Sequence, residues 1–174
     1  LDIGGGTTDI AVISLSGIVS KISIRVAGNK LDENIVKYVK NRYDVLIGEK
    51  TAELLKTHIG SAIPPEEEEY FEVKGRNLRT GLPQRIRVSA TEAFEAMQRT
   101  PPELVGDIYS NGILMTGGTS QLKNLDKLVA QRIEIKARVA ENPVDCVARG
   151  TGMAFDMIDD LQEGFKDCST KLRK

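Results

Sequence analysis

The sequence predicts an α/β protein with a small α+β module inserted into it. Short apolar strands open the chain, a helical and then a hairpin pattern occupies residues 29–89, and a strand, glycine turn and helix follow from Gly112. The 174 residues suit one domain or two tightly joined small ones. With 40% hydrophobic and 28% charged residues, the chain has enough apolar material for a folded core.

The first 26 residues predict three short strands in a meander. Apolar and polar residues alternate around two turn signals, at residues 4–6 and at Ser16-Gly17.

Two helices are predicted next. Apolar residues at helical spacing indicate a helix from about residue 31 to 43, with Asp32 and Glu33 in its first turn, where the helix dipole favours acids. A second helix is expected over residues 51–59, with Gly60 just beyond its end.

A hairpin and a short helix follow. The acidic run at 66–69 reads as a solvated loop, and residues 70–74 and 85–88 read as strands joined by a long turn. A helix is expected over residues 91–98, ending before Pro101-Pro102.

The last part of the chain has a clear α/β pattern. Residues 113–115 form a short apolar strand, and a glycine turn at 116–120 leads into an amphipathic helix. Residues 136–140 predict another strand, Pro143 is placed to start a helix, and the last dozen residues are expected to fray.

Charge and cysteine content exclude several classes of protein. The net charge of −1 argues against a nucleic-acid partner. No apolar run approaches the roughly 20 residues of a membrane span. Cys146 and Cys168 are read as reduced thiols of a cytosolic protein. Because Leu1 is not a methionine and stands almost on a glycine turn, we expect the chain to be a fragment cut inside a strand.

The first glycine turn is the sharpest chemical feature. Gly4, Gly5 and Gly6 remove every Cβ from the turn, so that backbone N–H groups can approach an anion, and Thr7 and Thr8 add hydroxyl donors. Such a turn can hold phosphate oxygens.

The acids that flank this turn suggest metal and water chemistry. Asp2 is placed to bind a hydrated Mg²⁺, which takes one or two carboxylates beside substrate phosphates. Asp9 or Thr8 could orient an attacking water. The alternative is a glycine-rich hairpin with solvated acids, because short glycine motifs recur by chance.

Two further features agree with a nucleotide. Gly117 and Gly118 form a second turn between a strand and a helix, although a plain connecting loop would look the same. Glu53 and Lys56 are neighbours on one helical face and could contact ribose or adenine. Their spacing alone favours an ordinary surface ion pair.

Together these residues resemble the actin, Hsp70 and sugar-kinase superfamily, most closely its rod-shape-determining bacterial actin branch, over nearly the whole chain. Residues 2–9 are similar to its second phosphate loop, 47–56 to its ribose and adenine helix, and 116–120 to its adenosine loop. The segments at 75–83 and 140–143 are more diagnostic, because Hsp70-type chaperones share the first loop but not that hairpin.

The resemblance implies the second half of an actin-like ATPase with a ribonuclease H-like core. Residues 1–28 and 90–174 would form the core subdomain, with a five-stranded mixed sheet and flanking helices. Residues 29–89 would form the small inserted subdomain.

The resemblance also implies the ligands and the site. ATP and Mg²⁺ would bind between two such halves, with Asp2 as the metal ligand. The expected catalytic residues are Asp2, Thr8 and Asp9. The expected cofactor-binding residues are Gly4, Gly5, Gly6, Thr7, Glu53, Lys56, Gly117, Gly118, Thr119 and Ser120.

In the cell the resemblance implies a filament-forming protein that maintains rod shape by organising cell-wall synthesis. It would lie in the cytoplasm at the inner face of the membrane, self-associate and meet cell-wall elongation proteins. Membrane contact would be made only through segments outside this chain, and no nucleic acid is expected.

The chain departs from the family pattern at several places. The first phosphate loop would lie before Leu1, so half a cleft should not hydrolyse ATP efficiently. Asp9 stands where Glu is common, and Thr119 stands where a third glycine is usual. The helix between residues 89 and 101 is short, which leaves apolar sheet surface uncovered and predicts marginal stability or self-association.

Two other functions remain open from the sequence. One is another ATPase of the superfamily, such as a chaperone or a sugar or acetate kinase. The other is a shortened scaffold that has lost nucleotide binding.

Overall fold

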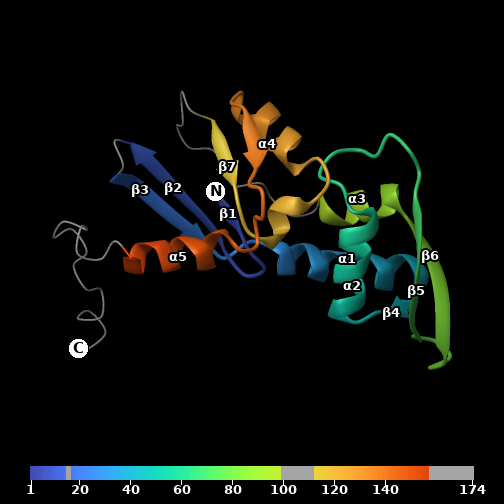
Figure 1. Cartoon of the computed structure of the whole chain (residues 1–174). Coiled ribbons are helices and arrows are strands. Elements are labelled where there is room, and N and C mark those ends of the chain that lie inside the picture. The colour runs from blue at the N-terminus through green and yellow to red at the C-terminus, as the bar shows by residue number, and fades with distance from the viewer. Residues whose placement is uncertain (15–16, 99–111, 157–174) are drawn as a thin grey trace.

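The computed structural model describes residues 1–14, 17–98 and 112–156 (Figure 1). Its strands are β1 (Asp2–Ile3), β2 (Thr8–Ser14), β3 (Gly17–Ile24), β4 (Val45–Leu46), β5 (Tyr70–Asn77), β6 (Pro83–Ser89), β7 (Ile113–Met115) and β8 (Ala137–Val139). Its helices are α1 (Gly28–Tyr43), α2 (Glu49–Ile59), α3 (Ala90–Met97), α4 (Leu125–Ile133) and α5 (Cys146–Asp156). The expected turn at Pro101-Pro102 and the last dozen residues lie outside the described residues.

The predicted meander is confirmed. β1, β2 and β3 form an antiparallel sheet in that order, with Asp2 opposite Asp9 and an irregular register between Val12 and Ile13.

The strands near the end of the described chain form a second, parallel pair. β7 and β8 are hydrogen-bonded to each other. The backbone also joins this pair to the first sheet, because the N–H of Ile3 donates to the carbonyl of Thr116 and the N–H of Thr116 donates to that of Leu1, both over 2.8 Å. The described strands form two three-stranded sheets, β1-β2-β3 and β4-β5-β6, and the two-stranded sheet of β7 and β8. The five-stranded sheet that was expected is not seen as such among them, but the mixed α/β content agrees with the predicted class.

The hairpin of β5 and β6 is longer than predicted, and β4, which the sequence analysis missed, pairs with β5. Asn77 explains the tighter turn. Its Oδ1 accepts hydrogen bonds from the backbone N–H groups of Arg79 and Thr80, and its Nδ2 donates to Gln84 over 2.6 Å. Because this one side chain organises the turn, the strands extend through positions whose glycine and proline suggested loop.

The predicted helices are present, with shifted starts. α1 begins at Gly28, three residues earlier than expected, so Asp32 lies in its second turn rather than at its dipole-favoured start. The helix after the second glycine turn is preceded by a short 3-10 turn, η1 (Gly118–Gln121). α5 begins at Cys146 and not at Pro143.

Apolar side chains form two separate cores. The larger core lies between α1, α2, α3 and the sheet of β4–β6, and its fully buried members include Ile35, Val39, Val45 and Leu55. The smaller core contains Ile3, Ala27, Ile113, Met115 and Val129. α1 runs from one region to the other (Figure 1).

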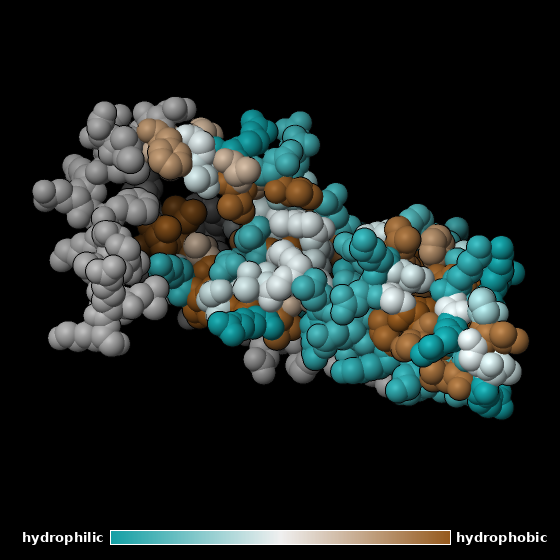
Figure 2. Space-filling view, turned by 90° about the horizontal axis from the view of Figure 1, so that it is seen from below, coloured by the Kyte–Doolittle hydropathy of each residue, from teal (hydrophilic) through white to brown (hydrophobic). Residues whose placement is uncertain are grey.

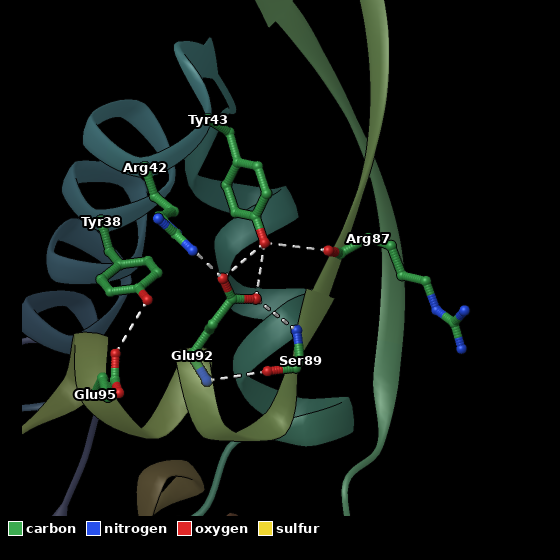
Figure 3. A network of polar contacts seen from close by, with 7 residues as sticks. All are labelled: Tyr38, Arg42, Tyr43, Arg87, Ser89, Glu92 and Glu95. Carbon is green, nitrogen blue, oxygen red and sulfur yellow. Dashed lines mark hydrogen bonds and ion pairs between the residues drawn. The ribbon is translucent and has the colours of Figure 1, made fainter.

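A polar network joins α1, α3 and β6 beside the larger core (Figure 3). Ser89 and Glu92 form a capping box at the start of α3. The hydroxyl of Tyr43 lies 2.7 Å from both carboxylate oxygens of Glu92, and the Arg42 guanidinium is 3.8 Å from the same carboxylate. One acid thus caps its own helix and ties it to the end of α1.

Apolar surface is left open on the first sheet. Ile13, Ile18 and Ile22 are 68%, 63% and 59% exposed. In Figure 2 apolar side chains gather in patches toward both ends of the visible face, with hydrophilic side chains between them. Among the described residues, no helix is long and apolar enough to cross a membrane.

Candidate functional site

The first glycine turn connects β1 and β2. The N–H of Gly4 donates to the carbonyl of Thr7 over 3.0 Å and closes the turn. Gly5, Gly6 and Thr7 are exposed, and the Thr7 hydroxyl donates to the carboxylate of Asp9 over 3.1 Å. The tip of the turn is therefore open to a ligand.

The first residues of α1 hold this turn from the other side. The N–H of Gly28 donates to the carbonyl of Gly4 over 3.2 Å, and the N–H of Asn29 donates to the carbonyl of Gly5 over 2.8 Å. The first N–H groups of a helix have no partner within the helix, and two of them are satisfied here by the turn.

The second glycine turn meets the first. The Thr119 hydroxyl donates to the carbonyl of Gly4 over 2.8 Å, and the Thr116 hydroxyl donates to the Asp2 carboxylate over 2.7 Å. Gly117 has a φ of +83°, and a Cβ there would overlap with the carbonyl of Ile3. Glycine is therefore required where the two turns pack.

The remaining residues of the second turn differ in exposure. Gly118 is exposed, and no atom lies within 4 Å of the position that a Cβ would take. Ser120 is fully buried, and its hydroxyl donates to the Gly117 carbonyl over 2.7 Å. Ser120 thus stabilises the turn from inside.

The three residues expected to be catalytic lie in different surroundings. Asp2 and Asp9 face each other across β1 and β2, with Asp2 half-buried and Asp9 exposed. Thr8 is 2% exposed, and its hydroxyl donates to the Val26 carbonyl over 2.7 Å. The hydrogen of that hydroxyl is therefore used within the fold.

Lys56 reaches the turns from α2, whereas Glu53 is exposed on the same helix. The Lys56 ammonium lies 2.8 Å from Asp32 Oδ2 and 3.3 Å from the carbonyl oxygen of Gly28. The spacing favoured a surface ion pair between Lys56 and Glu53. In the structure Lys56 pairs with Asp32 instead. Burial raises the pKa of the Asp32 carboxyl, and the Lys56 ammonium opposes that rise.

Sequence reasoning missed three residues of this site. Gly28 was read as part of a loop, Asp32 as an acid placed by the helix dipole, and Thr116 only as part of a turn. The close approach at Gly28 has no signal in the sequence. The ion pair between Asp32 and Lys56 had a weak signal in the sequence, since the two residues occur on successive predicted amphipathic helices.

The acids do not make a metal site by themselves. Within the described ranges, no group of three or more His, Cys, Asp or Glu side chains is placed to hold a metal ion. Asp2 offers one carboxylate beside the glycine turn, which suits a cation that arrives with phosphate oxygens.

Known proteins are similar to this chain over most of its length. The model of the MreB/Mbl protein family matches residues 1–163. The cell shape-determining protein MreB of Escherichia coli K12 is 45% identical, over 91% of this chain and 50% of its own length. The cell shape-determining protein Mbl of Bacillus subtilis 168 is 44% identical, over 92% of this chain and 53% of its own length.

Solved structures of similar fold include an MreB protein and a MamK filament. The crystal structure of MreB5 of Spiroplasma citri bound to AMPPNP superposes with a TM-score of 0.81 at 37% identity, covering 91% of this chain and 52% of that one. A MamK filament structure, at a TM-score of 0.67 and 22% identity, shares the fold.

The chain spans about half the length of the curated relatives it matches. The family model matches all of this chain except residues 164–174. The chain therefore belongs to the MreB/Mbl protein family.

Proposed function

We propose that this chain forms one side of the ATP·Mg²⁺ site of an actin-like protein that determines cell shape. The observation that carries the proposal is the meeting of the two glycine turns through Thr119 and Gly4. MreB5 of Spiroplasma citri, which shares this fold, was crystallised with AMPPNP and with ADP.

Each turn has its own part in the proposal. The exposed backbone of Gly5, Gly6 and Thr7 receives phosphate oxygens, because successive N–H groups in a turn form an anion-binding concavity. Gly118, whose Cβ position is open, allows the adenosine to approach the backbone, and Gly117 packs this turn against the first one. Thr119 and Ser120 hold the turn in place.

The α2 residues face the sugar. Lys56 lies at the junction of α1 and the turns, and Glu53 is one turn away on the same helix. We assign both to the ribose and the adenine.

Magnesium arrives with the nucleotide. Asp2 supplies one carboxylate, and phosphate oxygens and waters complete the six ligands that Mg²⁺ prefers. Asp9 and Thr8 are the candidates for orienting the attacking water. The Thr8 hydroxyl donates its hydrogen to the Val26 carbonyl, so only its oxygen is left to accept a hydrogen bond from that water.

The domain division of this family is part of the proposal. Residues 1–28 and 90–174 form the core subdomain, in which β3, β2, β1, β7 and β8 act as one five-stranded mixed sheet. The backbone bonds between Ile3 and Thr116 support that continuity. Residues 29–89 form the inserted subdomain around the larger apolar core.

The cellular role follows from the relatives. The curated relatives are named cell shape-determining proteins. We infer that the intact protein self-associates into filaments, organises cell-wall elongation proteins and lies in the cytoplasm at the inner face of the membrane.

Calorimetric titration with ATP·Mg²⁺ tests nucleotide binding by this chain. We expect a saturable heat that ADP competes away. Gly6→Asp should abolish it, because the substitution places a carboxylate in open space at the tip of the phosphate turn, with no steric change.

Gly152→Asp is the matched control. It introduces the same charge at an exposed glycine of α5 that also has nothing within 4 Å of its Cβ position, and it should leave the heat unchanged. A wild-type chain that gives no heat would contradict the proposal and favour a scaffold. Transfer of phosphate from ATP to a small acceptor by the intact protein would favour a kinase.

A further inference from the structure

We propose that Asp32 is a positioning residue of the nucleotide site, which holds the Lys56 ammonium so that one of its N–H groups points at the ribose hydroxyls. The inference rests on the proposed function, and it adds to it a residue outside the glycine turns and the α2 helix.

The geometry of the pair comes first. Asp32 lies on α1 and Lys56 on α2, and the two are 8% exposed each. Their charged atoms are 2.8 Å apart. Long lysine side chains are almost never buried unless they are paired, so Asp32 fixes where this ammonium can lie.

The second contact of Lys56 directs it toward the turns. Its ammonium is 3.3 Å from the carbonyl oxygen of Gly28. A Cβ placed on Gly28 would lie 3.3 Å from Lys56 Nζ and would overlap with Thr119 Oγ1, so both side chains converge on this residue. Gly28 also donates its N–H to the carbonyl of Gly4, in the phosphate turn.

The number of N–H donors on Lys56 leaves one of them for a ligand. An ammonium has three N–H groups. Asp32 and Gly28 accept two of them, which leaves one that we assign to the ligand.

The Asp32 carboxylate is not explained by stability. Its Oδ1 is buried and has no hydrogen-bond partner within the described residues. A buried ion pair with an unsatisfied oxygen is often less stable than an apolar pair of the same size. Orientation of Lys56 gives this carboxylate a role besides stability.

The experiment measures how much the ribose hydroxyls contribute to nucleotide affinity. Binding of ADP and of 2′,3′-dideoxy-ADP is titrated calorimetrically for the wild-type chain and for Asp32→Asn. The wild-type chain should prefer ADP by roughly tenfold, the effect of one hydrogen bond to a charged group. In Asp32→Asn that preference should fall toward one, because a neutral amide oxygen holds the ammonium less firmly than a carboxylate does.

Glu33→Gln is the matched control. Glu33 is the next residue of α1, and its exposed carboxylate pairs with Lys30 at 2.9 Å. The same loss of charge there should leave both affinities and their ratio unchanged.

The outcomes separate the two proposals. A wild-type chain that binds neither nucleotide overturns the proposed function and this inference with it. A chain that binds ADP with no preference over the dideoxy form, or an Asp32→Asn variant that keeps the preference, overturns the positioning role alone.

The ratio of the two affinities, for ADP and for 2′,3′-dideoxy-ADP, distinguishes a positioning role of Asp32 from a merely structural one. General loosening of the site weakens both nucleotides equally and leaves the ratio as in the wild-type chain, which overturns the inference. If Asp32→Asn does not fold, Asp32→Glu takes its place, because it keeps the charge and the Lys56 donor but moves the carboxylate by one methylene. The preference for ADP should fall in Asp32→Glu as well, and a variant that keeps it overturns the inference.

Discussion

The Thr119 hydroxyl donates a hydrogen bond of 2.8 Å to the carbonyl oxygen of Gly4, which lies 115 residues earlier in the chain. The same carbonyl accepts the N–H of Gly28 at the start of α1. One backbone oxygen thus joins both glycine turns and the first helix. A glycine at position 119 could not make this contact, because it has no side-chain donor.

Gly117→Ala should destabilise the fold by about 2–4 kcal/mol, because alanine is strained at positive φ and its Cβ would meet the Ile3 carbonyl. Gly118→Ala, one residue later, should stay within about 0.5 kcal/mol of the wild type, since its Cβ position is open. Denaturant midpoints measure both. Equal midpoints for the two variants would mean that the turns do not pack as described.

Leu55→Ala should cost about 2–5 kcal/mol, because Leu55 is fully buried in the larger core. Its neighbour Leu54 is 51% exposed on the same helix and serves as the control. Leu54→Ala should change the unfolding free energy by about 0.5 kcal/mol or less. A similar loss in both variants would contradict the placement of α2.

Tyr43→Phe should lower the unfolding free energy by about 1–2 kcal/mol, because it removes a hydrogen bond to the charged Glu92 carboxylate. Tyr70→Phe is the control. Tyr70 is 52% exposed, and its ring, which the substitution keeps, lies against the Arg87 guanidinium at 4.1 Å. Chemical denaturation of both variants decides whether the network of Figure 3 stabilises the fold.

Tyrosine ionisation should be delayed at alkaline pH. Burial, together with the Glu95 carboxylate, raises the pKa of Tyr38 to about 12, and burial with Glu92 raises the pKa of Tyr43 as well. The folded state therefore holds these protons more tightly than the unfolded state. Their contribution to stability is complete below about pH 10 and is lost as the pH rises through the folded values.

Absorbance of tyrosinate during a pH titration measures this delay. Tyr38→Phe and Tyr43→Phe should each remove part of the late-titrating signal. Titration of all the signal near pH 10 in the folded chain would contradict the described contacts of both residues.

The open isoleucines of the first sheet should promote self-association of this chain. Ile18→Thr/Ile22→Thr keeps β-branched residues in the strand and removes exposed apolar surface. Its sedimentation coefficient should fall toward the monomer value at concentrations where the wild-type chain associates. Leu78→Thr, at the tip of the other hairpin, is the control, and a wild-type chain that stays monomeric would contradict the prediction.

Most of the secondary structure could be predicted from the sequence because its signals are local. The glycine turn at residues 4–6 and the apolar alternation around it mark the first strands directly. β4 could not be found, since its two residues are a strand only by pairing with β5. The long hairpin was underestimated because cross-strand pairing overrides the turn preference of residues such as Gly75.

The site was predicted in part. Glycine composition pointed to both turns, and the structure brings those turns together. The partner of Lys56 could not be predicted from the sequence. Glu53 is its neighbour on the same helix, whereas Asp32 lies on another helix, and the distance from Lys56 to Asp32 depends on how the two helices pack. Asp32 and Gly28 belong to the site only through contacts between distant segments.

α1 has 16 residues and is about 24 Å long at 1.5 Å per residue, and one end of it is hydrogen-bonded to the first glycine turn. Its far end at Tyr43 is locked to Glu92 and so to α3. A tilt of about 5° at Gly28 would move Tyr43 by about 2 Å over that length. A small movement of the turn at residues 4–6 would therefore be magnified at the β5–β6 hairpin, which lies at the far end of α1.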